Sequence, residues 1–180
     1  MAKADLEIVG GAASTPVLTF EAEDRDTSTQ IATMKAGEPV KRRATDLDAV
    51  ELIITGEPTY STTASSFIGI VQKESTETAT ADGTVDVAVV VPFITKLRGK
   101  MTTPGNADTA SELRAFQMNA VKFDGISAIT GNTSTTKYTI DENDTDDQND
   151  AGLVIVGGDP DRGELDVYVK PLATLFGRSV

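Results

Sequence analysis

The stretch LVIVGGDPDRGELDVYVK, residues 153–170, decides the fold more than any other part of the chain. It opens with four consecutive apolar residues, which is the pattern of a strand in a protein core. Glycine, proline and aspartate crowd positions 157–163, and this composition is typical of a tight turn. From Glu164 to Lys170 polar and apolar residues alternate with period two, as in a strand with one wet and one dry face. We therefore predict a β-hairpin here.

Similar short strands recur through the rest of the chain, separated by turns rich in Gly, Pro and Asp. Gly69 interrupts the apolar run FIGIV and indicates either a bulge or a close approach of two backbones. The dipeptide Asp82-Gly83 predicts a tight turn before the next strand, because glycine accepts a positive φ at low cost. Besides the hairpin, the predicted strands cover residues 17–20, 50–54, 67–71, 85–91, 94–101, 121–125 and 137–140.

One helix is predicted, at residues 109–118, with Asp108 or Thr109 as its cap. Its buried stripe would consist of Leu113, Phe116 and Ala120. Many short strands with one short helix favour a mainly β fold, a small β-barrel or sandwich, with an α+β variant as the alternative.

The chain is expected to form a single β-rich domain at 30–180, preceded by an extended N-terminal arm at 1–29. The arm is suggested by a composition with little core of its own. A frayed terminus or an ordinary first strand is the alternative for the same residues.

The composition of the chain argues against several classes of partner. The chain has 180 residues, a formal net charge of −12, no cysteine and no histidine. The acidic balance argues against a nucleic-acid partner, since phosphate contacts need a basic surface. No run approaches the roughly 18–20 apolar residues of a membrane span, and residues 1–10 lack a signal-peptide core. We therefore expect a soluble protein with neither a nucleic-acid nor a membrane partner.

Catalysis is not expected. Without His and Cys the commonest general base and the strongest ordinary nucleophile are missing, and imidazole or thiolate metal sites cannot form. Neither Gly10-Gly11 nor Gly157-Gly158 extends to a phosphate-binding fingerprint. We expect no enzyme activity and no cofactor.

The acidic loop at 141–150 holds the one metal candidate. Oxygen ligands stand at alternating positions here, either Asp141, Asn143 and Thr145 or Asp144 and Asp146, as at the start of a calcium loop. The mid-loop glycine and closing glutamate of an EF-hand are absent. A solvated acidic loop is the alternative.

Four phrases of the sequence resemble the head structural proteins of tailed bacteriophages, particularly capsid decoration, or cement, proteins. They are KAGEPVK at 35–41, FIGIV at 67–71, ADGTVDV at 81–87 after a Thr-rich stretch, and VGGDP at 156–160. The resemblance covers residues 30–100 and, more loosely, 150–178. The predicted helix and the acidic loop have no counterpart in it.

The resemblance implies a virion protein, made in the host cytoplasm, that binds the outside of an assembled capsid and stabilises it. Its partner would be the major capsid protein, and it would act as a homo-oligomer, a trimer at local three-fold positions. The segment 1–29 would lie across neighbouring subunits.

Two alternatives stay open. Within a virion the chain is also compatible with a tail-tube or another head component. From a different class, a β-rich carbohydrate- or calcium-binding module is possible, although only Tyr60, Tyr138 and Tyr168 are available among Tyr and Trp to stack on a sugar.

Overall fold

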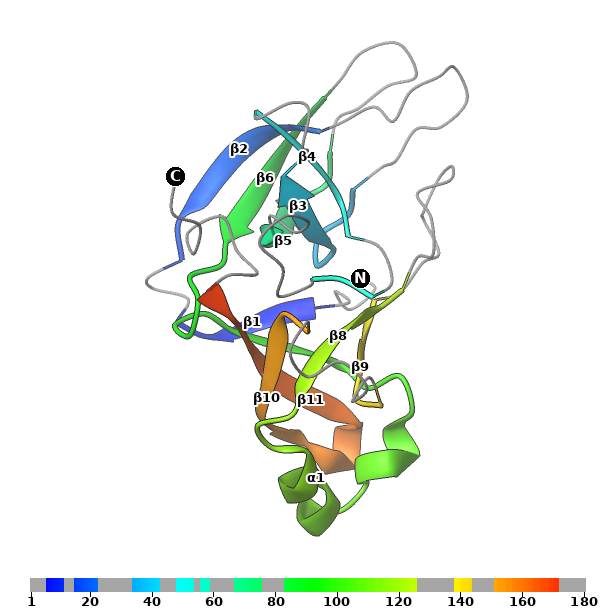
Figure 1. Ribbon diagram of the computed structural model, residues 1–180. Helices are drawn as coiled ribbons and strands as arrows, with labels where there is room; N and C mark the ends of the chain where they lie inside the picture. The colour runs from blue at the N-terminus through cyan, green and yellow to red at the C-terminus, as the bar shows by residue number, and fades with distance from the viewer. Residues whose placement is uncertain are drawn as a thin grey trace.

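The computed structural model describes residues 6–11, 15–22, 34–42, 48–53, 56–58, 67–75, 83–125, 138–143 and 151–171. These residues form a closed five-stranded barrel and a six-stranded sheet. The barrel lies above the sheet in Figure 1. The predicted fold class, mainly β with a small barrel and one short α-helix, is confirmed for the described part of the chain. No helix in that part is long and apolar enough to cross a membrane.

The barrel has the strand order β2-β4-β3-β5-β6. Its strands are β2 (Val17–Ala22), β3 (Pro39–Arg42), β4 (Ala49–Leu52), β5 (Phe67–Lys73) and β6 (Gly83–Val89). The β2–β4 pair is parallel, and the other pairs are antiparallel. Along β6, Val85, Val87 and Val89 are buried at alternate positions and line the interior.

Gly69 on β5 shows why this barrel needs a glycine. A Cβ at that position would collide with the main-chain carbonyl of Ala88 on β6. The register also shifts where β5 pairs with β3, between Val40 and Lys41. The prediction of a close backbone approach at Gly69 is therefore confirmed, and an irregularity in strand pairing lies beside it.

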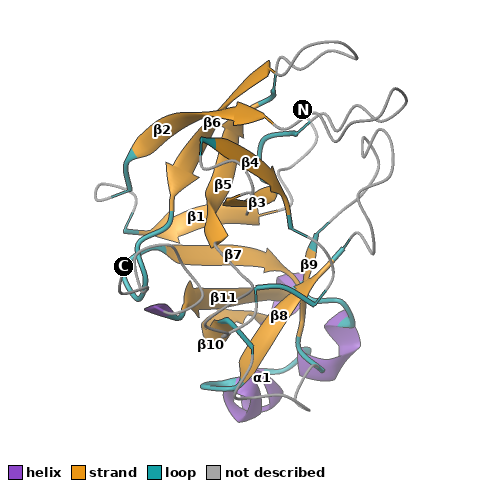
Figure 2. Ribbon diagram, turned by 45° about the horizontal axis from the view of Figure 1, so that its top comes forward, coloured by secondary structure: helices purple, strands orange, loops and turns teal. Residues whose placement is uncertain are grey.

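The second sheet is antiparallel throughout, in the order β1-β7-β11-β10-β8-β9. Figure 2 shows its strands from the side. They are β1 (Leu6–Gly10), β7 (Lys96–Lys100), β8 (Ala120–Asp124), β9 (Thr139–Asp141), β10 (Leu153–Asp159) and β11 (Glu164–Val169).

The predicted hairpin is confirmed as β10 and β11. Its connection is a short 3-10 turn, η3 (Pro160–Arg162), and then Gly163, whose φ of 61° lies in the left-handed region that favours glycine.

The helix α1 (Ala110–Phe116) follows a 3-10 turn, η2 (Pro104–Ala107). Thr109 is its N-cap: the hydroxyl accepts from the N–H of Glu112, and the Glu112 carboxylate accepts from the N–H of Thr109. Leu113 is buried as predicted, and Phe116 packs partly against the core. Ala120 is buried too, but as the first residue of β8 rather than as part of the helix.

The N-terminal segment 1–29 requires a correction where the structure describes it. β1 pairs with β7 in the sheet, and β2 pairs with both β6 and β4 in the barrel. Leu6 and Ala22 are fully buried. The described residues of this segment follow the alternative of ordinary strands, because their apolar side chains complete the core instead of standing apart from it.

Barrel and sheet share one apolar cluster. The rings of Phe67 in β5 and Phe123 in β8 lie 6.0 Å apart, centroid to centroid. The buried hydroxyl of Tyr138, next to β9, donates to the carbonyl of Ile53, next to β4, at 2.6 Å. The segment 56–58 adds main-chain ties: Phe123 N donates to Glu57 O at 2.7 Å, and Gly56 N to Phe123 O at 3.0 Å.

Candidate functional site

The structure describes two of the predicted calcium ligands. Asp141 ends β9, and its Oδ1 accepts from the N–H of Asn143 at 3.0 Å. The Oδ1 of Asn143 accepts from Asn106 at 2.8 Å. Asp144, Thr145 and Asp146 lie outside the described residues. Across the described ranges no three acidic side chains are grouped to hold a metal ion. The calcium site stays a prediction.

Between Asp141 and Asn143 lies Glu142, a buried carboxylate that the sequence analysis does not single out. It accepts hydrogen bonds from the N–H groups of Thr102 and Thr103 and from the side-chain amides of Asn106 and Asn143, at 3.0–3.1 Å. Its role is to fasten the chain after β7 to the end of β9. The period of two along a strand was the available signal, because it places Glu142 on the same buried face as Ile140, with the half-buried Asp141 between them.

The charged face of the sheet consists of Lys96, Arg98 and Lys100 on β7 with Glu164 and Asp166 on β11. Arg98 donates two hydrogen bonds to Asp166, of 2.6 and 3.0 Å, and Lys96 forms an ion pair with the same carboxylate at 3.1 Å. Lys100 pairs with Glu164 at 3.1 Å.

This arrangement corrects the predicted wet face of the final strand. Glu164 and Asp166 are only 2% and 5% exposed, although both alternate with apolar residues as solvent-facing groups do. The basic side chains opposite them stay more exposed, so their stems shield the carboxylates while their charged ends reach water. Pairing then offsets the cost of burying charge.

The same geometry shifts two pKa values. Burial by itself would raise the pKa of Asp166, but the hydrogen bonds and charges of Arg98 and Lys96 outweigh it and hold that pKa below its ordinary value. The hydrogen bond to Asp166 raises the pKa of Arg98, with a smaller contribution from the charge of Glu7. Both groups are therefore charged at neutral pH.

Besides the charged face of the sheet, a second feature is a set of exposed apolar side chains, which we call the apolar end. It comprises Val9, Val17, Leu18, Phe93 and Ile94. Phe93 and Ile94 lie on the link 90–95 between barrel and sheet, and the other three lie on β1 and β2. The hydroxyls of Thr15, just before β2, and Thr95, just before β7, are 3.2 Å apart. Phe93 and Ile94 are 54% and 50% exposed. Contiguous exposed apolar surface marks contact sites for other proteins.

Phe93 is also strained. Its φ is 55°, in the left-handed region that a bulky residue adopts at a cost of order 1–3 kcal/mol. The surroundings hold it there: its N–H donates to the carbonyl of Val169 at 3.3 Å, and its ring meets Tyr168 edge-on at 6.4 Å. The strained backbone projects the ring outward, and strain of this kind clusters at functional positions.

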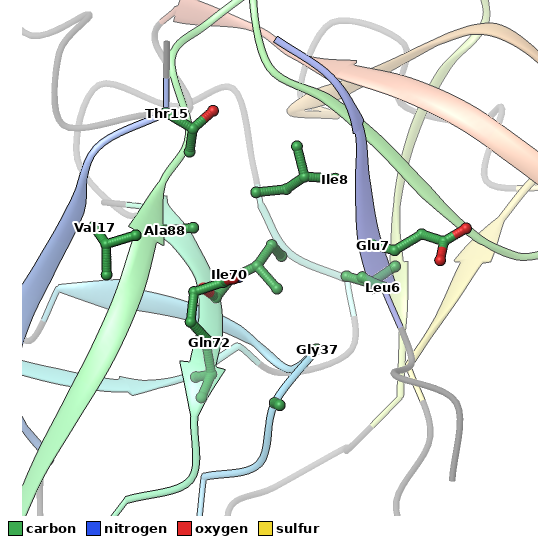
Figure 3. A pocket seen from close by; sticks show the side chains of 11 residues that line it. Leu6, Glu7, Ile8, Thr15, Val17, Gly37, Ile70, Gln72 and Ala88 are labelled. Atoms are coloured by element: carbon green, nitrogen blue, oxygen red, sulfur yellow. The ribbon is translucent and has the colours of Figure 1, made fainter. Parts of the chain in front are cut away.

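A third feature is the cleft between β1 and the outer face of the barrel, about 360 Å³ in volume. Figure 3 shows Ile8 pointing from β1 toward the barrel, with Ile70, Ala88 and Val17 on the opposite side. Thr15 and Gln72 add polar groups. Glu7 also lines the cleft, but its side chain points to the other side of β1 in the same view. The lining of the cleft is thus mixed, with apolar and polar surface in similar amounts.

No protein-family model matches this chain, and no functionally characterised protein matches it. Its function is therefore inferred from these three features and from the resemblance of its sequence.

Proposed function

We propose that this chain is a virion structural protein that binds the outer surface of an assembled phage capsid and stabilises it. The observation that supports this role best is the apolar end, an uncharged contact surface on a chain of net charge −12. A protein that must stay dispersed until it meets its lattice benefits from a charged body, because like charges suppress association. A surface of exposed aromatic and aliphatic side chains then supplies contact energy.

The body suits the same role. The barrel and sheet share a core, main-chain ties at 56–58 join them, and paired charges cover one sheet face. A decoration protein transmits load between capsid subunits, and a stiff two-layer body does so better than a hinged one. The proposed partner is the major capsid protein, and the proposed assembly on the lattice is a trimer.

Electron microscopy of undecorated heads mixed with the purified protein tests the proposal. We expect saturable extra density that follows the symmetry of the shell. Heads that stay bare at saturating protein would rule the role out. Tubes formed by the protein alone would favour the tail-tube alternative.

A variant pair then tests the surface. Phe93→Ser combined with Ile94→Ser should weaken head binding by at least about tenfold, because it removes two exposed apolar contacts. Met118→Ser is the matched control. Met118 is 73% exposed and also has a positive φ, 71°. It follows α1 by two residues, and α1 lies at the opposite end of the molecule from β2 in Figure 1. Equal binding by the double variant and the control would exclude the apolar end as the contact surface.

A further inference from the structure

The edge of β1 faces the cleft. β1 is the outermost strand of the six-stranded sheet, so only one of its sides pairs with β7. The N–H of Leu6 points to the other side and donates to the carbonyl of Gly37 at 3.1 Å. Along an antiparallel strand the main-chain groups of every second residue face the same way. The N–H and C=O of Ile8 therefore face the cleft, next to a position where the barrel already pairs with this edge.

The room beside that edge suits a chain segment. At roughly 30 Å³ per water, 360 Å³ corresponds to about a dozen water molecules. Ile70 and Ala88 are almost fully buried, whereas Val17 is 56% exposed. Apolar side chains alternating along an extended segment would displace this water while its main chain pairs with Ile8.

The charged residues beside the cleft indicate which kind of segment can bind in it. Val17 pairs with Ala88, and the next two pairs on the same outer face of the barrel are Thr19 with Asp86 and Glu21 with Thr84. The floor of the cleft thus continues into two carboxylates. Asp86 has Lys73 of β5 as its register partner, whereas Glu21 is exposed. A second copy of this chain would bring a net charge of −12 and repel these carboxylates. A partner segment with a lysine or arginine beyond its apolar residues is complementary to them.

We propose that this cleft binds an extended segment of the partner chain, which pairs with the outer edge of β1 at Ile8, places apolar side chains over Ile70 and Ala88, and sets a basic residue over Glu21. Strand addition to an exposed sheet edge is a general mode of recognition. The inference rests on the proposed function in one respect, that the partner is the capsid shell subunit.

The first test fills the cleft. Val17→Trp keeps the apolar end apolar but places a large ring at the cleft mouth. We expect its dissociation constant for undecorated heads to rise at least about tenfold. Gln117→Trp, at the exposed end of α1, is the matched control and should bind like the wild type. Far-ultraviolet circular dichroism and thermal melting establish that both variants fold. A folded Val17→Trp variant with wild-type affinity would overturn the inference.

Two further readouts are specific to strand addition. Amide hydrogen exchange at Ile8 should slow when the wild type binds heads. Glu21→Gln should weaken binding and reduce its dependence on salt, since an exposed charge pair is screened by ions. Head binding that leaves exchange at Ile8 unchanged would also overturn the inference, while the proposed function would stand. Absence of wild-type binding would instead refute the proposed function.

Discussion

At the scale of single residues, the carboxylate of Asp166 links the structure to pH. Its folded-state pKa lies below the ordinary value of about 3.9, because Arg98 and Lys96 outweigh the effect of burial. The folded protein therefore binds fewer protons here than the unfolded chain in acid. The contribution to stability is complete above the ordinary pKa and is lost as pH falls through the folded pKa.

We expect Asp166→Asn to lower the free energy of unfolding by about 1–3 kcal/mol at pH 6, since it removes charge-assisted hydrogen bonds. The difference from wild type should shrink as the pH falls below the ordinary pKa of an aspartate and through the lower folded-state pKa, because the wild-type carboxylate then protonates as well. Urea denaturation across this range measures it. Tyr168→Phe, on the same strand face, is the control and leaves the carboxylate in place. A difference that stays constant with pH would contradict the assignment.

At the scale of elements, the β5–β6 pairing depends on the absence of one side chain. We expect Gly69→Ala to destabilise the protein by more than about 2 kcal/mol, because the added Cβ meets the main-chain carbonyl of Ala88, which cannot turn aside. Gly105→Ala is the control: its Cβ would meet nothing within 4 Å, so its effect should stay within about 0.5 kcal/mol. Equal stabilities of the two variants, measured by urea denaturation, would contradict the close approach.

At the scale of the whole molecule, the shared core predicts one cooperative unfolding transition. The chain has no tryptophan, so a single one can report locally. Phe20→Trp places it in the barrel, and Phe116→Trp places it on α1 beside the sheet; both phenylalanines are half-buried against the core. We expect the two fluorescence midpoints in urea to coincide with each variant's circular dichroism midpoint. Separate midpoints within one variant would show that barrel and sheet unfold independently.

Much of the fold was predictable because the strands are short, strongly patterned and bounded by glycine and proline. The hairpin β10–β11, the glycine-marked strand β5 and the capped helix all lie where the sequence pattern places them. The N-terminal strands were harder. A strand is predicted at 17–20, within β2, although Val17 and Leu18 are exposed, whereas β1 is identified by its long-range pairing with β7.

The candidate sites were less predictable, since each combines segments far apart in the chain. The apolar end joins residues near position 10 to residues near position 93, and the cleft joins β1 to three barrel strands. No local pattern encodes such a junction. The calcium prediction, by contrast, rested on a local pattern, and its two described residues hydrogen-bond within the protein.

The final hairpin shows where the division falls. The amino-acid sequence by itself determined that residues 153–170 form two strands and a turn, because period-two alternation and turn residues act locally. Only the tertiary structure decided that Glu164 and Asp166 are buried, because β7, more than sixty residues earlier in the chain, places three basic side chains opposite them. Polarity in a pattern specifies which residues share a face, whereas the neighbouring strand determines whether that face meets water or a matching row of charge.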